Sequence, residues 1–266
     1  DFLRTGIMKS YSPSFLLEPD HASREAAFRY YLTNGGYPAL VRTDMTDDDR
    51  YAWLINYVRT YLERDVRDLA DFRSLAPFVK VQKMTALLTG SLLNFSELAR
   101  EAGVTAHTAR RFINYLEISY QAILLQPWSR NKLKRLVKSP KLHYLDPGVQ
   151  KAVIRKSGEP AGNEFESAVI AEIYKQTMNM QLRGSFYHLR TVDGRETDLL
   201  IETEKGYYAF EIKQAGRVGR TDARHLSGLA SILDKPLLAS FPISKDPGVR
   251  MRTDNTLAIP AALFLS

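Results

Sequence analysis

Three charged residues, Asp198, Glu211 and Lys213, have the types and spacing expected of a site for a hard cation. The surrounding sequence predicts two strands, roughly Glu196–Thr203 and Tyr207–Lys213, joined by a tight turn. Because side chains alternate along a strand, Glu211 and Lys213 are expected on one face, and Asp198 can reach the same region from the neighbouring strand. Mg²⁺ prefers oxygen ligands and keeps several of its waters. The sequence therefore predicts a Mg²⁺ or Mn²⁺ site in which the lysine orients or deprotonates a bound water.

The same residues also have a purely structural interpretation. A strand with one face in water commonly carries charged pairs there, so Glu211 and Lys213 alone do not distinguish a site from an exposed strand face. The site interpretation requires the carboxylates of Asp198 and Glu211 to lie within about 6 Å of each other, because they must share one cation. It also requires Lys213 to lie on the same face.

The succession of Asp198 and then Glu211-x-Lys213 on adjacent strands resembles the PD-(D/E)xK nuclease superfamily. The predicted order of helix, strands, helix and strand is that of the superfamily core. Its remaining elements are a helix at Gly162–Asn179, a helix at Thr221–Leu233 and a strand at Pro236–Phe241. The resemblance implies a restriction-endonuclease-like α/β domain.

The resemblance also implies roles for individual residues. Asp198 and Glu211 would hold the metal, and Glu166 on the preceding helix would complete the ligand set. Lys213 would position the attacking water, and Gln214 would orient a phosphate or a water. Together these five residues form the candidate catalytic set.

Composition limits the class of protein. The chain has 266 residues, 44% of them apolar, which is enough for two or three domains, and its net charge of +7 favours a polyanionic partner. There is no cysteine, which excludes disulfides and thiolate metal sites. No apolar run is long enough to cross a membrane and no signal peptide is visible, so we expect a cytoplasmic protein without a membrane partner. The chain begins with Asp1 and not with methionine, which is compatible with a fragment of a longer protein.

Residues 1–77 are predicted to be a helical region, with one helix from His21 to a glycine cap at Asn34-Gly35-Gly36. A second, longer helix is predicted from a cap at Thr46 to about Leu69. Its apolar residues recur every three or four positions, which is typical of a buried stripe.

Residues 78–154 resemble a winged helix-turn-helix. The predicted elements are helices around Phe78–Leu88, Phe95–Ala102 and Thr105–Tyr120 and strands at Ala122–Trp128 and Lys141–Leu145. In such folds the second helix of the motif enters the major groove and the wing contacts the backbone. The candidate DNA-binding residues are Thr105, His107, Thr108, Arg110 and Arg111 on the helix and Arg130, Lys132, Lys134, Arg135 and Lys138 on the wing. The alternative is a winged helix that binds protein, with its cations simply solvated.

Short motifs in a fixed order along most of the chain resemble the C-terminal part of a prokaryotic AAA+ ATPase family that carries the domain of unknown function DUF4143. They are Gly35-Gly36-Tyr37-Pro38, residues 61–66, residues 115–117, residues 141–148, Phe165-Glu166, residues 197–200 and residues 211–213. Members of that family have an N-terminal ATPase domain. This chain contains no G-x-x-x-x-G-K-[ST] loop, so ATP would act only through a domain that lies outside it.

The sequence thus predicts an α+β multidomain protein with a helical region at residues 1–77, a winged helix at 78–154 and a nuclease-like domain at 155–266. Two functions remain open. One is a Mg²⁺-dependent DNA endonuclease attached to an ATPase. The other is an inactive module that binds DNA or protein and regulates that ATPase. The sequence leaves the oligomeric state open.

Overall fold

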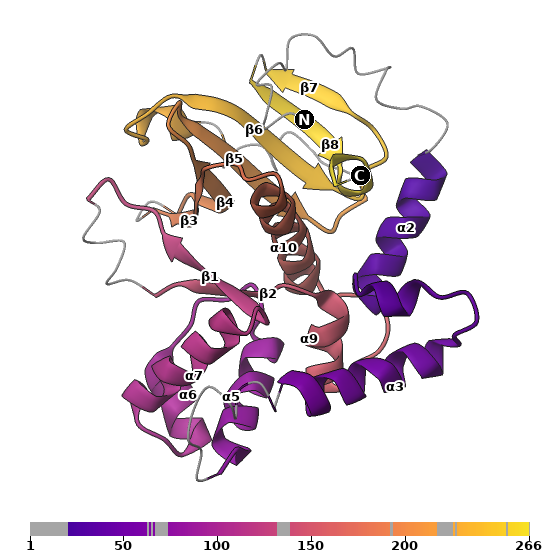
Figure 1. Cartoon of the computed structure of the whole chain (residues 1–266). Coiled ribbons are helices and arrows are strands. Elements are labelled where there is room, and N and C mark those ends of the chain that lie inside the picture. Colours follow the sequence, from indigo (N-terminus) through magenta and orange to yellow (C-terminus); the bar gives the residue numbers. More distant parts are fainter. Residues whose placement is uncertain are drawn as a thin grey trace. The chain divides into compact units, whose positions relative to one another are not determined.

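The computed structural model describes residues 21–62, 64, 66, 74–131, 139–191, 194–216, 226, 228–253 and 255–265. The chain divides into two units, which are considered separately here. The helical unit comprises residues 30–124 and 139–171, and the sheet unit comprises residues 1–29, 125–138 and 172–266. The described fold is α+β, and eight described strands form one mixed sheet in the order β2-β1-β3-β4-β5-β6-β8-β7 (Figure 1).

Helices dominate the first part of the chain. They are α2 (His21–Asn34), η3 (Pro38–Val41), α3 (Asp47–Tyr57), η4 (Val58–Leu62), α5 (Ala76–Leu87), α6 (Phe95–Ala102), α7 (Ala106–Ile118), α9 (Pro147–Ile154) and α10 (Gly162–Asn179). The predicted cap at Thr46 is present, because its side chain accepts the Asp49 N–H while the Asp49 side chain accepts the Thr46 N–H. The regular α-helix ends at Tyr57 and continues as a π-helical segment, η4. The rest of the predicted long helix falls mostly outside the described residues.

The core of the helical unit includes residues of α5, α6 and α7, which appear together in Figure 1, and also of α3, α9, β1 and β2. Phe78 of α5 meets Phe112 of α7 edge to face, with ring centroids 5.7 Å apart. Gly103 separates α6 from α7 with φ 69°, a left-handed conformation that glycine adopts without the steric cost of a Cβ. Thr105 then caps α7 by accepting the N–H of Thr108. The two helices predicted here, the glycine turn between them and the threonine cap are therefore present.

A close junction joins α2 to α9 within the helical unit. The Asp146 carboxylate accepts the N–H of Gly36 at 2.8 Å and that of Val149 at 2.9 Å. Gly35 has φ 82°, and a Cβ there would overlap Asp146 Oδ1. The Gly35-Gly36 pair and the buried Asp146 are therefore fitted to each other, which gives these motif residues a structural role.

Strands dominate the second part of the chain. They are β1 (Ala122–Pro127), β2 (Lys141–Tyr144), β3 (Ser185–Arg190), β4 (Glu196–Glu202), β5 (Tyr207–Lys213), β6 (Leu237–Ser244), β7 (Arg250–Thr253) and β8 (Thr256–Pro260). The short helices η5 (Leu229–Ser231) and α11 (Ala261–Phe264) complete this part. The predicted helix at residues 221–233 falls largely outside the described residues, and η5 is its described portion. The predicted strands at residues 122–128 and 141–145 correspond to β1 and β2, and the end of β1 also pairs with β3.

Strand β5 is central in the sheet unit: it pairs antiparallel with β4 and parallel with β6. On one face, Leu200 and Ala209 belong to an apolar cluster with Tyr207 and Leu229. On the other face, Phe210 stacks on Phe241 at 5.3 Å. Both faces of β5 are therefore covered along most of its length, and a charged residue there is removed from water.

Candidate functional site

The hairpin of β4 and β5 brings the predicted carboxylates near each other. Leu199 of β4 lies opposite Phe210 of β5 in the antiparallel ladder. The regular ladder ends at this pair, and β4 carries a bulge between Thr197 and Leu200 where it pairs with β3. Just beyond the ladder, Asp198 accepts the N–H of Ile212, and its negative charge acts on Glu211, so the two carboxylates lie near each other. Lys213 lies two residues after Glu211 and shares its face of β5. The hairpin therefore brings Asp198, Glu211 and Lys213 into one region, and a shared cation site there stays a prediction.

Both carboxylates are removed from solvent. Asp198 is 5% exposed and Glu211 is 3% exposed. Lys213 is more open, with 44% of its side chain exposed. A charged pair on the wet face of a strand would expose its carboxylate, so the structural interpretation of Glu211 does not fit its surroundings.

The oxygen atoms of the pair have different partners. Asp198 Oδ2 accepts the backbone N–H of Ile212 at 2.7 Å, which ties β4 to β5 through a side chain. Glu211 Oε1 lies 2.8 Å from Lys213 Nζ. Glu211 Oε2 is buried and has no hydrogen-bond partner among the residues that the structure describes. A buried carboxylate oxygen without a partner is costly unless a cation or a proton compensates it.

The surroundings favour the protonated form of Glu211. Burial is the main cause that raises the pKa of Glu211 to about 7, and the negative charge of Asp198 adds to this effect. The hydrogen bond and the positive charge of Lys213 act in the opposite direction. A divalent cation between the two carboxylates would reverse the balance, since it stabilises both negative charges.

This donor set suits a hard cation that retains waters. Within the described ranges, no group of three or more histidine, cysteine, aspartate or glutamate side chains is placed to hold one metal. Asp198 and Glu211 supply two carboxylates, and Mg²⁺ is commonly held by one or two carboxylates together with waters and substrate phosphates. The partnerless Oε2 of Glu211 is consistent with such a ligand.

The other two members of the candidate catalytic set, Glu166 and Gln214, lie outside β4 and β5. Glu166 lies on the part of α10 that belongs to the helical unit, where its Oε1 is 3.3 Å from Nζ of the buried Lys141. Gln214 directly follows β5. The metal-binding role of Glu166 and the orienting role of Gln214 stay predictions.

The candidate DNA-binding residues of α7 divide into two groups. Thr105 and Thr108 form the helix cap, since Thr105 Oγ1 accepts the Thr108 N–H at 3.1 Å. His107, Arg110 and Arg111 are exposed on the helix surface. The Arg110 guanidinium lies over the ring of Phe95 on α6, 4.0 Å from its centroid, and this contact restricts its conformation.

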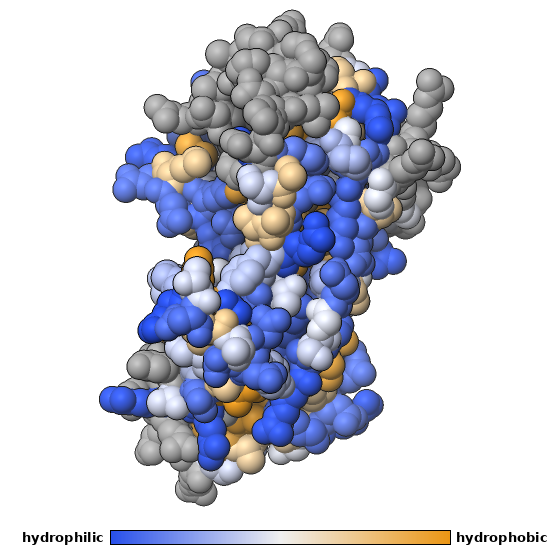
Figure 2. All heavy atoms as spheres, turned by 90° about the vertical axis from the view of Figure 1, so that its right-hand side faces the viewer, coloured by the Kyte–Doolittle hydropathy of each residue, from blue (hydrophilic) through white to orange (hydrophobic). Residues whose placement is uncertain are grey.

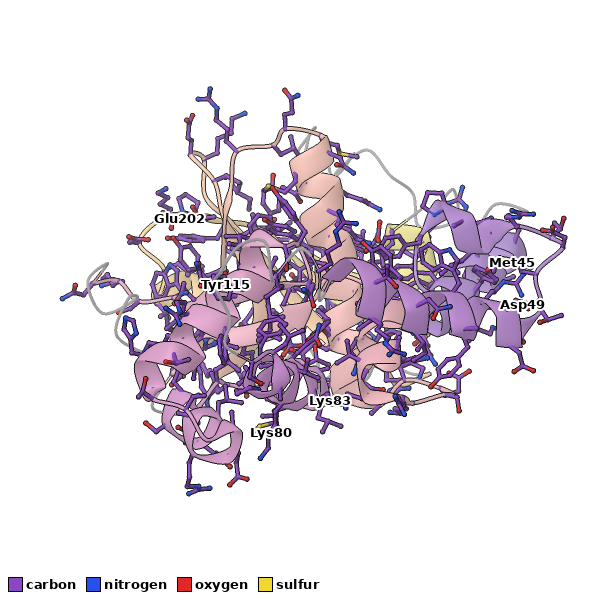
Figure 3. All side chains as sticks on the ribbon, turned by 60° about the horizontal axis from the view of Figure 1, so that its bottom comes forward. Met45, Asp49, Lys80, Lys83, Tyr115 and Glu202 are labelled. Carbon is purple, nitrogen blue, oxygen red and sulfur yellow. The ribbon has the colours of Figure 1, made fainter. Side chains whose placement is uncertain are left out.

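Basic residues outside α7 also include members of the candidate DNA-binding set. Lys80 and Lys83 are exposed on α5 and extend outward from it (Figure 3). In the sheet unit, Arg130 is exposed and donates to the Ile232 carbonyl at 3.0 Å. The predicted wing residues Lys132, Lys134, Arg135 and Lys138 lie outside the described residues. Figure 2 shows a largely hydrophilic face on which hydrophobic residues form small separate patches.

Comparison with known proteins identifies the family. Residues 25–159, half of the chain, match a domain of unknown function (DUF8612). The chain belongs to the DUF8612 family. Residues 161–264 match a second domain of unknown function, DUF4143, which confirms the predicted resemblance to DUF4143.

Two curated relatives of this DUF8612 protein have the same degree of similarity. They are the uncharacterized proteins Mb2031c of Mycobacterium bovis and Rv2008c of Mycobacterium tuberculosis. Each is 30% identical over 248 residues, which is 91% of this chain and 54% of the relative. The chain therefore spans about half the length of these relatives. In the part of the chain that the structure describes, no helix is both long and apolar enough to cross a membrane.

Proposed function

We propose that this chain binds DNA and hydrolyses its phosphodiester bonds with the help of Mg²⁺ or Mn²⁺, in the manner of a PD-(D/E)xK nuclease. The observation that carries the proposal is Oε2 of Glu211, which is buried beside Asp198 and Lys213 and has no hydrogen-bond partner in the described part of the chain. A strand that served only the fold would gain stability from an apolar residue at this position, because a buried carboxylate oxygen without a partner is unfavourable. A cation site accounts for its presence.

The residues of the hairpin formed by β4 and β5 would have separate roles in this reaction. Asp198 and Glu211 would hold the metal, and Asp198 is held in place by the Ile212 N–H. When bound, a divalent metal lowers the pKa of its water and offsets the charge that develops on the phosphate. Lys213 carries hydrogen-bond donors and no acceptor, so as an ammonium it would orient the attacking water through the lone pairs of that water. Gln214 would orient a phosphate oxygen or the water.

The substrate part of the proposal depends on the surface of α7. His107, Arg110 and Arg111 are exposed there, and the first turn of a recognition helix is the part that reaches base edges in helix-turn-helix proteins. Cations on such a surface bind the phosphate backbone through electrostatic attraction and the release of counterions. The winged-helix interpretation of α5, α6, α7, β1 and β2 belongs to this proposal.

The wider context is also a proposal. The resemblance to the C-terminal part of an AAA+ ATPase implies that an ATPase domain works with this chain, and the chain itself contains no phosphate-binding loop. ATP would then drive or license the nuclease from outside the chain.

A metal-binding and cleavage experiment tests the proposal. Mn²⁺ binding is measured by calorimetry on the native chain and on Asp198→Asn and Glu211→Gln. Glu202→Gln serves as the matched control, because Glu202 is on β4, the strand that carries Asp198, and its side chain pairs with Lys235. Cleavage of duplex, single-stranded and branched DNA is then measured with Mg²⁺, Mn²⁺ or Ca²⁺. We expect one Mn²⁺ site that both site variants lose, and cleavage with Mg²⁺ or Mn²⁺ but not with Ca²⁺. Mn²⁺ affinity that is equal in all four proteins would refute the site.

The second candidate function is a module that binds DNA or protein and regulates the ATPase without cleavage. The cations of α7 favour it, since they do not require a metal site. It predicts DNA binding that depends on Arg110 and Arg111, together with no cleavage even when the ATPase domain is supplied. The two functions are separated by Glu211→Gln, which should abolish cleavage and leave DNA binding unchanged.

A further inference from the structure

An exposed aromatic side chain follows the C-terminal end of α7. Tyr120 lies two residues beyond the helix and is 78% exposed. Its ring and its hydroxyl make no hydrogen bond, ion pair or ring contact with the residues that the structure describes. Apolar surface stabilises a fold only where it is removed from water, so this ring contributes little to packing.

The backbone at Tyr120 has a conformation that suits glycine. The Tyr120 N–H donates to the Glu117 carbonyl, and the next N–H along the chain, that of Gln121, donates to the Leu116 carbonyl. This helix ending requires a left-handed residue, and Tyr120 has φ 54°. Helix α6 ends with the same two bonds, and there the left-handed residue is Gly103. Tyrosine adopts this conformation less readily than glycine, so backbone geometry does not account for the ring either.

Two further helices end in the same way with a residue other than glycine. Arg155 follows α9 and Gln181 follows α10, each with φ 53°. Both are exposed, and their side chains are polar, so water solvates them. Tyr120 differs from them because it presents an aromatic face to solvent at this position.

Tyr120 lies just beyond the end of an exposed stripe on α7. Residues three or four positions apart lie on the same side of a helix. The exposed residues with this spacing are His107, Arg111, Asn114 and Ile118. From Arg111 to Ile118 the stripe extends about 10 Å, which is roughly three nucleotides along one DNA strand.

The two ends of this stripe suit different parts of a nucleic acid. Cations near the start of α7 attract phosphates. The C-terminal end of a helix carries partial negative charge, and Glu117 lies in the last turn of α7, so a phosphate is unfavourable there. An uncharged ring can instead stack on the face of a base. Bases inside a duplex have both faces covered by their neighbours, so such a ring requires an unpaired base.

We propose that Tyr120 is a binding residue that stacks on an unpaired base, and that the DNA bound by this chain contains a junction between duplex and single strand. This inference rests on the DNA binding proposed for α7, and it names a class of substrate that the proposed function leaves open. Arg110 and Arg111 hold the duplex by its phosphates. Tyr120 receives a base roughly three nucleotides further along a strand.

Binding to two kinds of DNA tests this inference. Fluorescence anisotropy is measured with a blunt duplex and with the same duplex extended by a single-stranded overhang of about ten nucleotides, at either the 5′ or the 3′ end. We expect the native chain to bind one of the overhang DNAs about tenfold more tightly than the blunt duplex, the size of one stacking contact. Tyr120→Ala should lose this preference and bind the blunt duplex as the native chain does. Tyr120→Phe keeps the ring and should keep the preference. A native chain without the preference, or a Tyr120→Ala protein that retains it, overturns the inference.

Glycine variants separate this role from a role in the fold. Tyr120→Gly removes the ring and relieves the left-handed backbone, so its thermal unfolding should occur about 2 °C higher while the overhang preference is lost. Gln181→Gly is the matched control, because Gln181 has the same helix ending. It should be stabilised to a similar degree and keep the native preference. If Tyr120→Gly unfolds at a lower temperature than the native chain and Gln181→Gly does not, the ring supports the fold and the inference is wrong.

A fluorescent base gives a second readout. 2-Aminopurine placed in the overhang loses fluorescence when it stacks on a ring. The native chain and Tyr120→Phe should quench it most strongly at one position of the overhang, and Tyr120→Ala should not. Quenching that is the same in all three proteins overturns the inference.

The outcomes also separate this inference from the proposed function. If no DNA binds, or if binding does not depend on Arg110 and Arg111, the proposed DNA surface and the role of Tyr120 both fail. If binding depends on these arginines but the preference for overhang DNA does not depend on Tyr120, only the role of Tyr120 fails, and a contact with protein is favoured for its ring.

Discussion

The Asp198 carboxylate accepts the backbone N–H of Ile212 at 2.7 Å, so a side chain of β4 bonds directly to the backbone of β5 beside Glu211. A backbone amide is a fixed donor, and its hydrogen bond holds the carboxylate in one orientation. The same contact serves two purposes in the proposed site. It satisfies a buried N–H, and it fixes in place a carboxylate whose negative charge raises the pKa of Glu211.

Variants of Asp198 should separate these two purposes. Asp198→Asn keeps an oxygen that can accept the Ile212 N–H, so we expect a small loss of stability and a complete loss of the Mn²⁺ site. Asp198→Ala leaves the N–H without a partner, and we expect it to be less stable than Asp198→Asn by about 1–3 kcal/mol. Urea unfolding of the three proteins without metal measures the difference. Equal stability of the two variants would mean that the hydrogen bond does not hold the strands together.

Sequence patterns were sufficient to predict the helices and strands that have regular periodicity or clear caps. The predicted bounds of α10 and β5 agree with the structure, and the Thr46 cap is present. Helix α9 was not predicted, because Asp146-Pro147-Gly148 is also a turn sequence. Here Asp146 acts as the N-cap and Pro147 occupies the first turn. Strands β7 and β8 were not predicted either, and β3 was expected only as a third strand of the core, without bounds, since neither β3 nor β7 alternates cleanly between buried and exposed residues.

For the candidate site, residue types and spacing were enough to select Asp198, Glu211 and Lys213, but not to predict burial. The 3% exposure of Glu211 results from strands on both sides of β5 and an apolar cluster on the same face, which are contacts between distant parts of the sequence.

The fit between Gly35 and Asp146 gives a prediction about stability. Gly35→Ala would put a side chain in a left-handed conformation and overlap Asp146 Oδ1, so we expect a loss of at least about 2 kcal/mol. Gly103→Ala is the matched control: its φ is 69°, but a Cβ there meets no described atom within 4 Å. We expect this control to lose only about 1–2 kcal/mol, the cost of the left-handed conformation itself. Thermal or urea unfolding measures both, and a larger loss for Gly103→Ala would contradict the proposed junction.

The raised pKa of Glu211 makes stability depend on pH in a defined direction. The ordinary pKa of this group is 4.5, and burial raises it to about 7 in the folded chain. A group whose pKa is higher in the folded state binds its proton more tightly there, so its contribution to stability is greatest below pH 4.5 and is lost as the pH rises to about 7. Each unit of pKa difference corresponds to about 1.4 kcal/mol. Compared with Glu211→Gln, the metal-free native chain should therefore lose unfolding free energy between pH 4.5 and 7. A difference between the two proteins that does not change with pH would mean that Glu211 titrates normally.

The exposed cations of α7 lead to a prediction about salt. Replacing both Arg110 and Arg111 with alanine should weaken duplex DNA binding and flatten its dependence on salt, because each lost phosphate contact reduces the log–log slope by about 0.9. Binding is measured by fluorescence anisotropy at several salt concentrations, with far-ultraviolet circular dichroism to verify the fold. Lys175→Ala is the control, since Lys175 pairs with Glu172 on α10, away from α7 in the sequence. Because Arg110 also lies over the Phe95 ring, Arg111→Ala alone separates DNA contact from a change in helix packing. If Arg111→Ala and the double variant bind DNA with the native affinity and slope, α7 does not contact DNA and a protein-binding role for this unit is favoured.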